Sequence, residues 1–130
     1  GAWEYVTAYV DNDSTQVKTY GTGLVGKYAN IYKASSQDDK VSTVDTEEPM
    51  SKANYNENLD KKGDAMIETS TSGAGSTAWG GDYSYFPYGG YPFALRGGSF
   101  DYSLSAGVFA FYRHSGGGFG ALGFRVVLVP

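Results

Sequence analysis

The last third of the chain consists of short β-rich segments separated by glycine- and serine-rich turns, and this spacing constrains the fold most. Residues 93–100, 106–112 and 123–129 are dominated by apolar and β-forming side chains. Short segments of this kind, bounded by turn residues, are typical of strands. Three of them in succession predict an antiparallel meander, and therefore a mostly β domain with little helix.

The first two thirds of the chain have a more varied pattern. Residues 3–10 alternate in the manner of a strand, and the short polar residues of 11–15 predict a turn after it. A short helix is expected over 27–33. The polar stretch 35–60 is expected to form a long surface loop with helical fragments, and 63–69 a strand or a short turn segment.

The length of 130 residues fits one domain spanning 1–130. Residues 3–10 and 123–129 give the strongest strand signals at the two chain ends. We therefore expect these end segments to be neighbours in one sheet. The chain opens directly on a strand-like segment, which suggests that a leader or an upstream domain precedes it in the full protein.

Composition excludes several classes of protein. The chain has no cysteine, so disulfides, thiolate metal sites and cysteine-based catalysis are excluded. Its net charge is −4, and it has no basic cluster of the kind that contacts phosphates, so nucleic acid is not an expected partner. No apolar run has the length of a membrane span, so membrane insertion is not expected either.

Catalytic and metal-binding residues are scarce in the sequence. His114 is the only histidine, and it lies in a glycine-rich turn with no nucleophile motif beside it. Five of the 14 Asp and Glu residues lie in 38–48, where a solvated loop is the simpler interpretation. Residues 11–13 lack the downstream glycine and glutamate of a calcium loop and suit a turn better. We therefore expect no enzymatic activity, no cofactor and no metal.

Tyrosine and glycine are over-used, with 12 Tyr and 19 Gly in the chain. Binding surfaces such as antibody loops show this composition. An all-β domain with many turns also uses both residues. Composition alone leaves these two interpretations open.

Three motifs stand out in the C-terminal third: Arg96-Gly97-Gly98-Ser99, Ala106-Gly107-Val108-Phe109 and Gly123-Phe124-Arg125-Val126-Val127. With them the C-terminal third resembles the end of the C-type lectin fold, in the branch of the formylglycine-generating enzymes. Trp3-Glu4-Tyr5-Val6 and Tyr83-Ser84-Tyr85-Phe86-Pro87 look like relatives found in phages and prophages. The resemblance implies a C-type-lectin-like fold, α+β and mostly β, with antiparallel sheets, a short early helix and long loops.

Two functions occur on the fold that the sequence resembles. Formylglycine generation depends on cysteines, so it does not transfer to this chain. The other function is ligand display by the variable proteins of diversity-generating retroelements, in which a fixed scaffold presents exchangeable side chains. In that family adenine mutagenesis does not produce Lys, Glu, Gln, Met or Trp, and none of the five occurs in 99–122. None occurs anywhere after Trp79 either, so this absence supports the assignment only weakly.

The resemblance places a variable, ligand-binding region at about 99–122, and we expect its side chains to be exposed and close together. Strand alternation predicts Phe109 and Phe111 in the core, with Tyr112 pointing outward. Arg96 is expected to be a scaffold residue paired with a carboxylate or with backbone carbonyls. The candidate ligand-binding residues are Phe100, Asp101, Tyr102, Leu104, Tyr112, Arg113, His114, Phe119 and Leu122.

The sequence leaves three functional hypotheses open. The first is a retroelement-diversified module that binds a protein or glycan ligand on a host or target cell surface, located on a phage tail or a bacterial surface. Such a module could form an oligomer through an upstream region. The second is a non-diversified phage structural or decoration domain. The third is a carbohydrate-binding lectin domain that stacks the aromatic residues of 79–91 on sugars.

Overall fold

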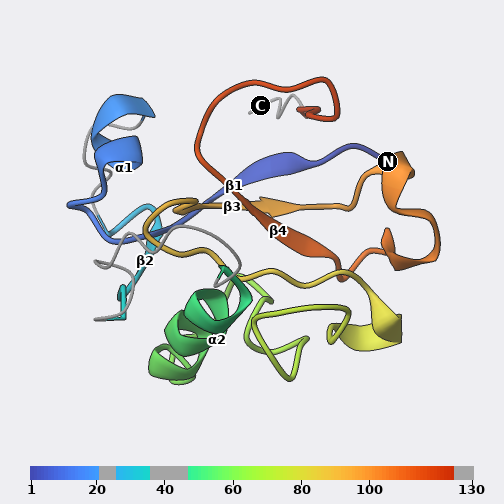
Figure 1. Ribbon diagram of the computed structural model, residues 1–130, viewed down its shortest axis with the longest axis horizontal. Helices are drawn as coiled ribbons and strands as arrows, with labels where there is room; N and C mark the ends of the chain where they lie inside the picture. The colour runs from blue at the N-terminus through green and yellow to red at the C-terminus, as the bar shows by residue number, and fades with distance from the viewer. Residues whose placement is uncertain (21–25, 36–46, 125–130) are drawn as a thin grey trace, which may run out of the picture.

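One mixed four-stranded sheet and two helices make the described part of the chain an α+β domain. The computed structural model describes residues 1–20, 26–35 and 47–124 (Figure 1). In chain order the elements are β1 (Glu4–Val10), α1 (Thr15–Tyr20), β2 (Asn30–Tyr32), α2 (Glu47–Glu57), a 3-10 turn (Trp79–Gly81), β3 (Phe93–Arg96), a second 3-10 turn (Phe100–Ser105) and β4 (Phe111–His114). The α+β class expected from the sequence is confirmed at this level.

The strand order in the sheet is β2-β1-β3-β4. β3 pairs antiparallel with both β1 and β4, and of these two pairs only that with β4 belongs to the expected meander. β1 and β2 pair in parallel, so the expectation of purely antiparallel sheets was wrong. The physical reason is the connection from Val10 to Asn30, which includes α1 and is long enough for the crossover that parallel strands need.

The helix expected over 27–33 is not formed. Residues 26–28 make a turn and Asn30–Tyr32 form β2. A helix of two turns is marginal on its own. Pairing with β1 instead provides backbone hydrogen bonds and buries Tyr32.

The main core lies between the sheet and α2. In Figure 1, α2 lies on one side of the sheet, while α1 and the segment after β4 lie on the other. Phe86 is fully buried, and its ring meets those of Tyr32 and Tyr55 edge-on at centroid distances of 4.9 Å and 5.6 Å. Ala94 of β3 and Phe111 of β4 complete this core from the sheet side. Phe111 is thus a core residue, as strand alternation predicted.

Hydrogen bonds of buried polar side chains fix α2. Ser51 donates to the carbonyls of Gly73 and Phe86, both at 2.5 Å. Asn54 accepts from the Ser35 amide at 2.5 Å and donates to the Pro87 carbonyl at 3.1 Å. The expected surface loop over 35–60 therefore contains a well-packed helix, and only the expectation of helical fragments is confirmed. Polar residues on its buried side gave no hydrophobic pattern from which the sequence could predict the packing.

The strand expected over 106–112 begins later than predicted. β4 spans Phe111–His114, and the preceding residues form a turn held by the side chain of Asp82. Asp82 is buried, and its two carboxylate oxygens accept from the amides of Gly107 at 3.1 Å and Phe109 at 2.9 Å. A Cβ atom on Gly107 would lie 2.2 Å from that carboxylate, so this close approach requires glycine.

Arg96 has the scaffold role that the sequence predicted. Its side chain is half-buried, and Nη1 donates to the Ala65 carbonyl at 3.2 Å. Burial lowers the pKa of Arg96, while the nearby carboxylates of Asp64 and Glu68 act in the opposite direction. The segment 63–69 that supplies these partners forms turns and no strand; of the two structures predicted for it, the turn is correct.

The two ends of the described chain meet. Trp3 and Leu122 form a parallel bridge, with the Trp3 amide donating to the Ala121 carbonyl at 2.9 Å and the Gly123 amide to the Trp3 carbonyl at 2.7 Å. Most of the strand predicted over 123–129 lies outside the described residues, so its pairing stays a prediction. No helix in the described ranges has the length and apolar character to cross a bilayer.

Candidate ligand-binding face

The first five residues of the chain bring together parts of the predicted binding region. The Gly1 carbonyl accepts from the Phe100 amide at 3.1 Å, which joins the second 3-10 turn to the N-terminus. Trp3 pairs with the segment around Leu122, as described above. Tyr5 contacts His114 and the loop that follows it. The sequence predicts a strand over 3–10 but gives no sign that this strand takes part in the site.

Tyr5, His114 and Phe119 form one cluster. The Tyr5 hydroxyl lies 2.5 Å from His114 Nδ1 and 2.8 Å from the Gly117 carbonyl oxygen. The His114 ring lies against Phe119 at a centroid distance of 4.6 Å. Burial lowers the pKa of His114, and it is the main cause that raises the pKa of Tyr5. Both pKa shifts favour the uncharged form of the group.

A second cluster surrounds Tyr112. Its ring stacks on Trp3 at 5.7 Å, and it also contacts Tyr83 at 5.5 Å and Tyr85 at 5.9 Å. Tyr112 and Leu122 are both partly buried and pack on Trp3 and its buried neighbours. The expectation that Tyr112 points freely outward was therefore wrong, because Trp3 and the 83–85 segment cover part of it.

Arg113 is buried, with 4% of its surface exposed, which contradicts the expected exposure. Its guanidinium lies over the rings of Tyr85 at 5.0 Å and Tyr88 at 4.9 Å. Strand alternation explains the error, since Arg113 shares the side of β4 occupied by Phe111 rather than that of Tyr112 and His114. Arg113 is a structural residue, and we remove it from the candidate site.

Phe100 and Asp101 are exposed at the start of the second 3-10 turn, and Phe100 shows 71% of its surface. Ser99 caps this turn by accepting from the Asp101 amide at 3.3 Å. The side chains of Tyr102 and Leu104 lie outside the described part of the structure, so their expected exposure stays a prediction. We call the following set the candidate face: Tyr5, Phe100, Asp101, Tyr112, His114, Phe119 and Leu122.

A further exposed apolar group lies outside the candidate face and was missed from the sequence. Trp79 is 57% exposed, and its ring meets that of Phe109 at 5.2 Å. Phe109 packs against the core but is only partly buried, so its predicted core position is confirmed only in part. The adjacent Val108 is 77% exposed. The sequence did contain a signal for this exposure. Trp79 lies in a stretch of glycine and other small residues, which have little side chain with which to cover an indole ring.

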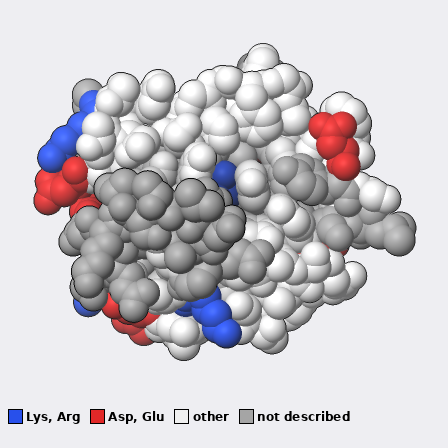
Figure 2. All heavy atoms as spheres, viewed as in Figure 1, with Lys and Arg blue, Asp and Glu red and all other residues white. Residues whose placement is uncertain are grey.

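Charge is nearly absent from the surface of 69–124. This segment has four charged residues, of which Asp82 and Arg113 are buried and Arg96 is half-buried, so Asp101 is its only exposed charge. Figure 2 shows one face of the molecule, on which a broad uncharged area covers the upper part and the charged atoms lie mainly toward the margins. Uncharged surfaces with exposed aromatic rings are typical of contact sites.

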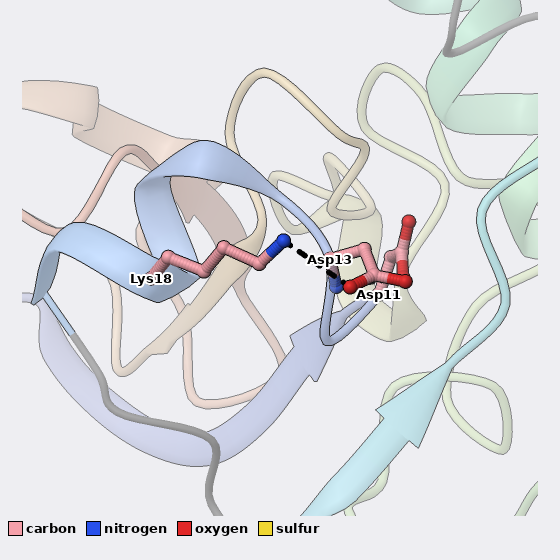
Figure 3. A network of polar contacts seen from close by, with 3 residues as sticks. All are labelled: Asp11, Asp13 and Lys18. Carbon is pink, nitrogen blue, oxygen red and sulfur yellow. Dashed lines mark hydrogen bonds and ion pairs between the residues drawn. The ribbon is translucent and has the colours of Figure 1, made fainter.

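Three charged residues that follow β1 make local contacts. Asp11 accepts from the Asp13 amide at 3.0 Å, and Asp13 pairs with Lys18 of α1 at 3.2 Å (Figure 3). Both partners of this ion pair are largely exposed, so it contributes little to stability. The contacts confirm the predicted turn after β1. Within the described ranges, no group of three or more acidic or histidine side chains is placed to hold a metal.

One open groove of about 410 Å³ lies away from the candidate face, beside β1 and β2. Asp64 lies in its wall and accepts from Asn30 at 3.1 Å and from the Tyr32 hydroxyl. Burial is the main cause that raises the pKa of Asp64. The carboxylate of Asp64 thus serves to hold β2 through Asn30 and Tyr32.

Comparison of the chain with protein-family models, with curated proteins and with solved structures gave no match.

Proposed function

We propose that this protein is a non-enzymatic display module with a C-type-lectin-like fold, and that it binds a protein or glycan ligand through its candidate face. The variable proteins of diversity-generating retroelements in phages and on bacterial surfaces are the class that its motifs resemble. In this proposal the sheet, α2 and the Asp82-held turn are the scaffold. The turn at Phe100 and the loop after β4 are the presenting parts.

The observation that most supports the proposal is the surface of 69–124, which has exposed aromatic rings and a single exposed charge at Asp101. Tyrosine and phenylalanine rings give large contact area at low entropic cost, as in antibody loops. A surface of this kind is a poor fit for nucleic acid, which needs clustered positive charge.

The chemistry of the candidate face also favours binding over catalysis. His114 is the only histidine, and its described polar partners are a phenol and a backbone amide rather than a carboxylate. A general base of the triad type needs an orienting acid and a neighbouring nucleophile. The surroundings of His114 provide neither among the described residues.

Binding to intact cells tests the proposal. The labelled protein should bind to cells of its target in a saturable manner, and Phe100→Ser or Phe119→Ser should abolish that binding. Leu59→Ser is the matched control. Leu59 is also an exposed apolar residue, but it is not part of the candidate face and is followed by charged residues in the sequence. Two outcomes would contradict the assignment of the face. Either all three variants lose binding to the same extent, or none of them loses binding.

The genome tests diversification separately from binding. A reverse transcriptase gene and a template copy of the segment 99–122 should lie near the gene. If they are absent while the binding experiment succeeds, the protein is a non-diversified module on the same scaffold.

The carbohydrate-binding alternative has one specific observation in its favour, the exposed Trp79 beside Phe109. Exposed indole rings stack well on apolar faces of sugars. A glycan array probed with the wild-type protein and with Trp79→Ser separates the two cases. Glycan binding that depends on Trp79 and not on Phe119 would favour the lectin.

A further inference from the structure

We propose that the groove beside β1 and β2 binds a sugar that carries an acidic group, with the sugar ring on Tyr28 and the acidic group at the lysines of the rim. Among the described residues, none that lines this groove belongs to the candidate face. Binding there is therefore independent of the display function. The shape, the hydrogen-bonding groups and the charge of the groove each point to this class of ligand.

The groove forms because β1 extends beyond the start of β2. β2 begins at Asn30, opposite Ala8, so the part of β1 before Ala8 has no partner in β2. The space that is left has a main part of about 410 Å³ and an adjoining part of about 270 Å³. The main part falls in the range of about 300–1,000 Å³ that is typical of small-ligand sites. The two parts share Gly26, Ala29 and Asn30.

Tyr28 gives the groove an aromatic wall. Its side chain is 69% exposed, and it lines the main part of the groove. An exposed tyrosine offers an apolar ring face next to a polar hydroxyl, and the carbon-bound hydrogens on one face of a sugar form a matching apolar surface. The ammonium group of Lys27 lies 5.3 Å from the centroid of the Tyr28 ring. A sugar stacked on Tyr28 is therefore close to a positive charge.

Asn30 supplies a hydrogen-bond acceptor in both parts of the groove. Its Nδ2 donates to Asp64 Oδ2 at 3.1 Å, which orients the amide and leaves Oδ1 as the acceptor. Asp64 is already engaged, since it also accepts from the Tyr32 hydroxyl and the Met66 amide. The hydroxyl of Thr7 is a further polar group of the lining. Amide and hydroxyl oxygens of this kind accept from hydroxyl groups, of which a sugar has several.

Three lysines line the groove, whereas its one carboxylate is engaged as just described. Lys27 borders the main part, and Lys61 and Lys62 border the adjoining part. None of the three forms an ion pair with a carboxylate of the described ranges. Asp60 and Glu68 lie nearby in the sequence, but neither lines the groove. The lining is thus positive in a chain whose net charge is −4, and this favours an anionic group on the ligand.

NMR titration of the isotope-labelled protein with matched sugars tests the proposal. The acidic sugars are glucuronic acid, galacturonic acid and glucose 6-phosphate, and the neutral ones are glucose and galactose. Amide signals of residues 26–30 and 61–64 should shift in a saturable manner with at least one acidic sugar. The dissociation constant of its neutral counterpart should be at least about tenfold higher, as expected for the loss of one hydrogen bond to a charged group. The acidic sugar that binds shows whether the lysines take a carboxylate or a phosphate.

Four outcomes of the titration would overturn the proposal. The first is equal binding of acidic and neutral sugars, and the second is no saturable shift with any acidic sugar. The third is that inorganic phosphate binds as tightly as the acidic sugars, because the lysines then hold an adventitious ion only. The fourth is that adenosine monophosphate binds more tightly than every acidic sugar, which would assign the groove to nucleotides.

Variants of exposed residues locate the binding without disturbing the fold. Tyr28→Ser, Lys27→Gln and Lys62→Gln should each raise the dissociation constant of the acidic sugar by about tenfold. Lys52→Gln is the matched control, since Lys52 is exposed on α2 and does not line the groove. An equal effect of Lys52→Gln, or no effect of the other three, would contradict the assignment. Phe119→Ser should bind the acidic sugar like the wild type, which separates this site from the candidate face.

Discussion

Residues 1–68 and 69–124 use charge in opposite ways. Nineteen of the 24 charged residues lie in the first region, where those described are mostly on the surface. The second region has four, and three of these are buried or half-buried. The first region therefore has an ordinary solvated surface, whereas the second keeps charge for structure and presents uncharged aromatic and glycine-rich segments. A surface with so little charge is expected where another molecule covers it.

A large effect is expected from removing a structural charge of the second region. Asp82→Ala leaves the amides of Gly107 and Phe109 without acceptors, and we expect a loss of about 3 kcal/mol in the free energy of unfolding. Chemical denaturation measures it. Asp101→Ala is the matched control, and it should leave the unfolding midpoint unchanged because Asp101 is exposed. Similar losses of stability for both variants would contradict the conclusion that Asp82 is a structural charge and Asp101 a surface charge.

In the first region the comparison predicts that buried amides, rather than charges, fix α2. Asn54→Ala removes the partners of the Ser35 amide and the Pro87 carbonyl and should cost about 2 kcal/mol. Asn56→Ala, an exposed position on the same helix, should change stability by less than about 0.5 kcal/mol. Thermal or urea unfolding of the pair gives the difference directly. If the two variants are equally stable, the helix is fixed by other contacts.

The pH dependence of stability should differ between wild type and His114→Phe. Burial lowers the folded-state pKa of His114, so the folded protein binds fewer protons there than the unfolded chain. The stabilising contribution is therefore present above the unfolded value of 6.5 and is lost as pH falls through the lower folded value. The raised pKa of Asp64 acts in the opposite sense, favouring the folded state as pH falls, and it is common to both proteins. Unfolding midpoints measured from pH 8 to pH 5 should thus decrease more steeply in the wild type, and parallel curves would contradict this.

The smallest expected effect is on the stability of the face itself. Phe100→Ser should change the free energy of unfolding by less than about 0.5 kcal/mol, because most of this side chain is already in water. The same change at Phe86, in the core, should cost about 4 kcal/mol. Differential scanning calorimetry of the two variants compares the loss of stability at an exposed phenylalanine with the loss at a buried one in the same region. A large loss at Phe100 would place it in the core and weaken the display proposal.

Several features of the site could be predicted from sequence and several could not. The exposure of Phe100 and Asp101 and the closeness of His114 to Phe119 follow from local turn composition. The burial of Arg113 could not be predicted, because it depends on Tyr85 and Tyr88 approaching from another segment. The role of Tyr5 in the site was also hidden, since 109 residues separate it from His114.

The sequence by itself determined the α+β class, the strand at residues 4–10, the pairing of β3 with β4 and the scaffold role of Arg96. These depend on local alternation, turn residues and the scarcity of charge. Only the tertiary structure decided that β2 pairs in parallel with β1, that α2 is fixed through Ser51 and Asn54, and that the N-terminal strand joins the parts of the candidate face. The physical reason is that hydrogen bonds between distant backbone and polar groups leave no periodic apolar pattern in the chain, and such bonds hold these features in place.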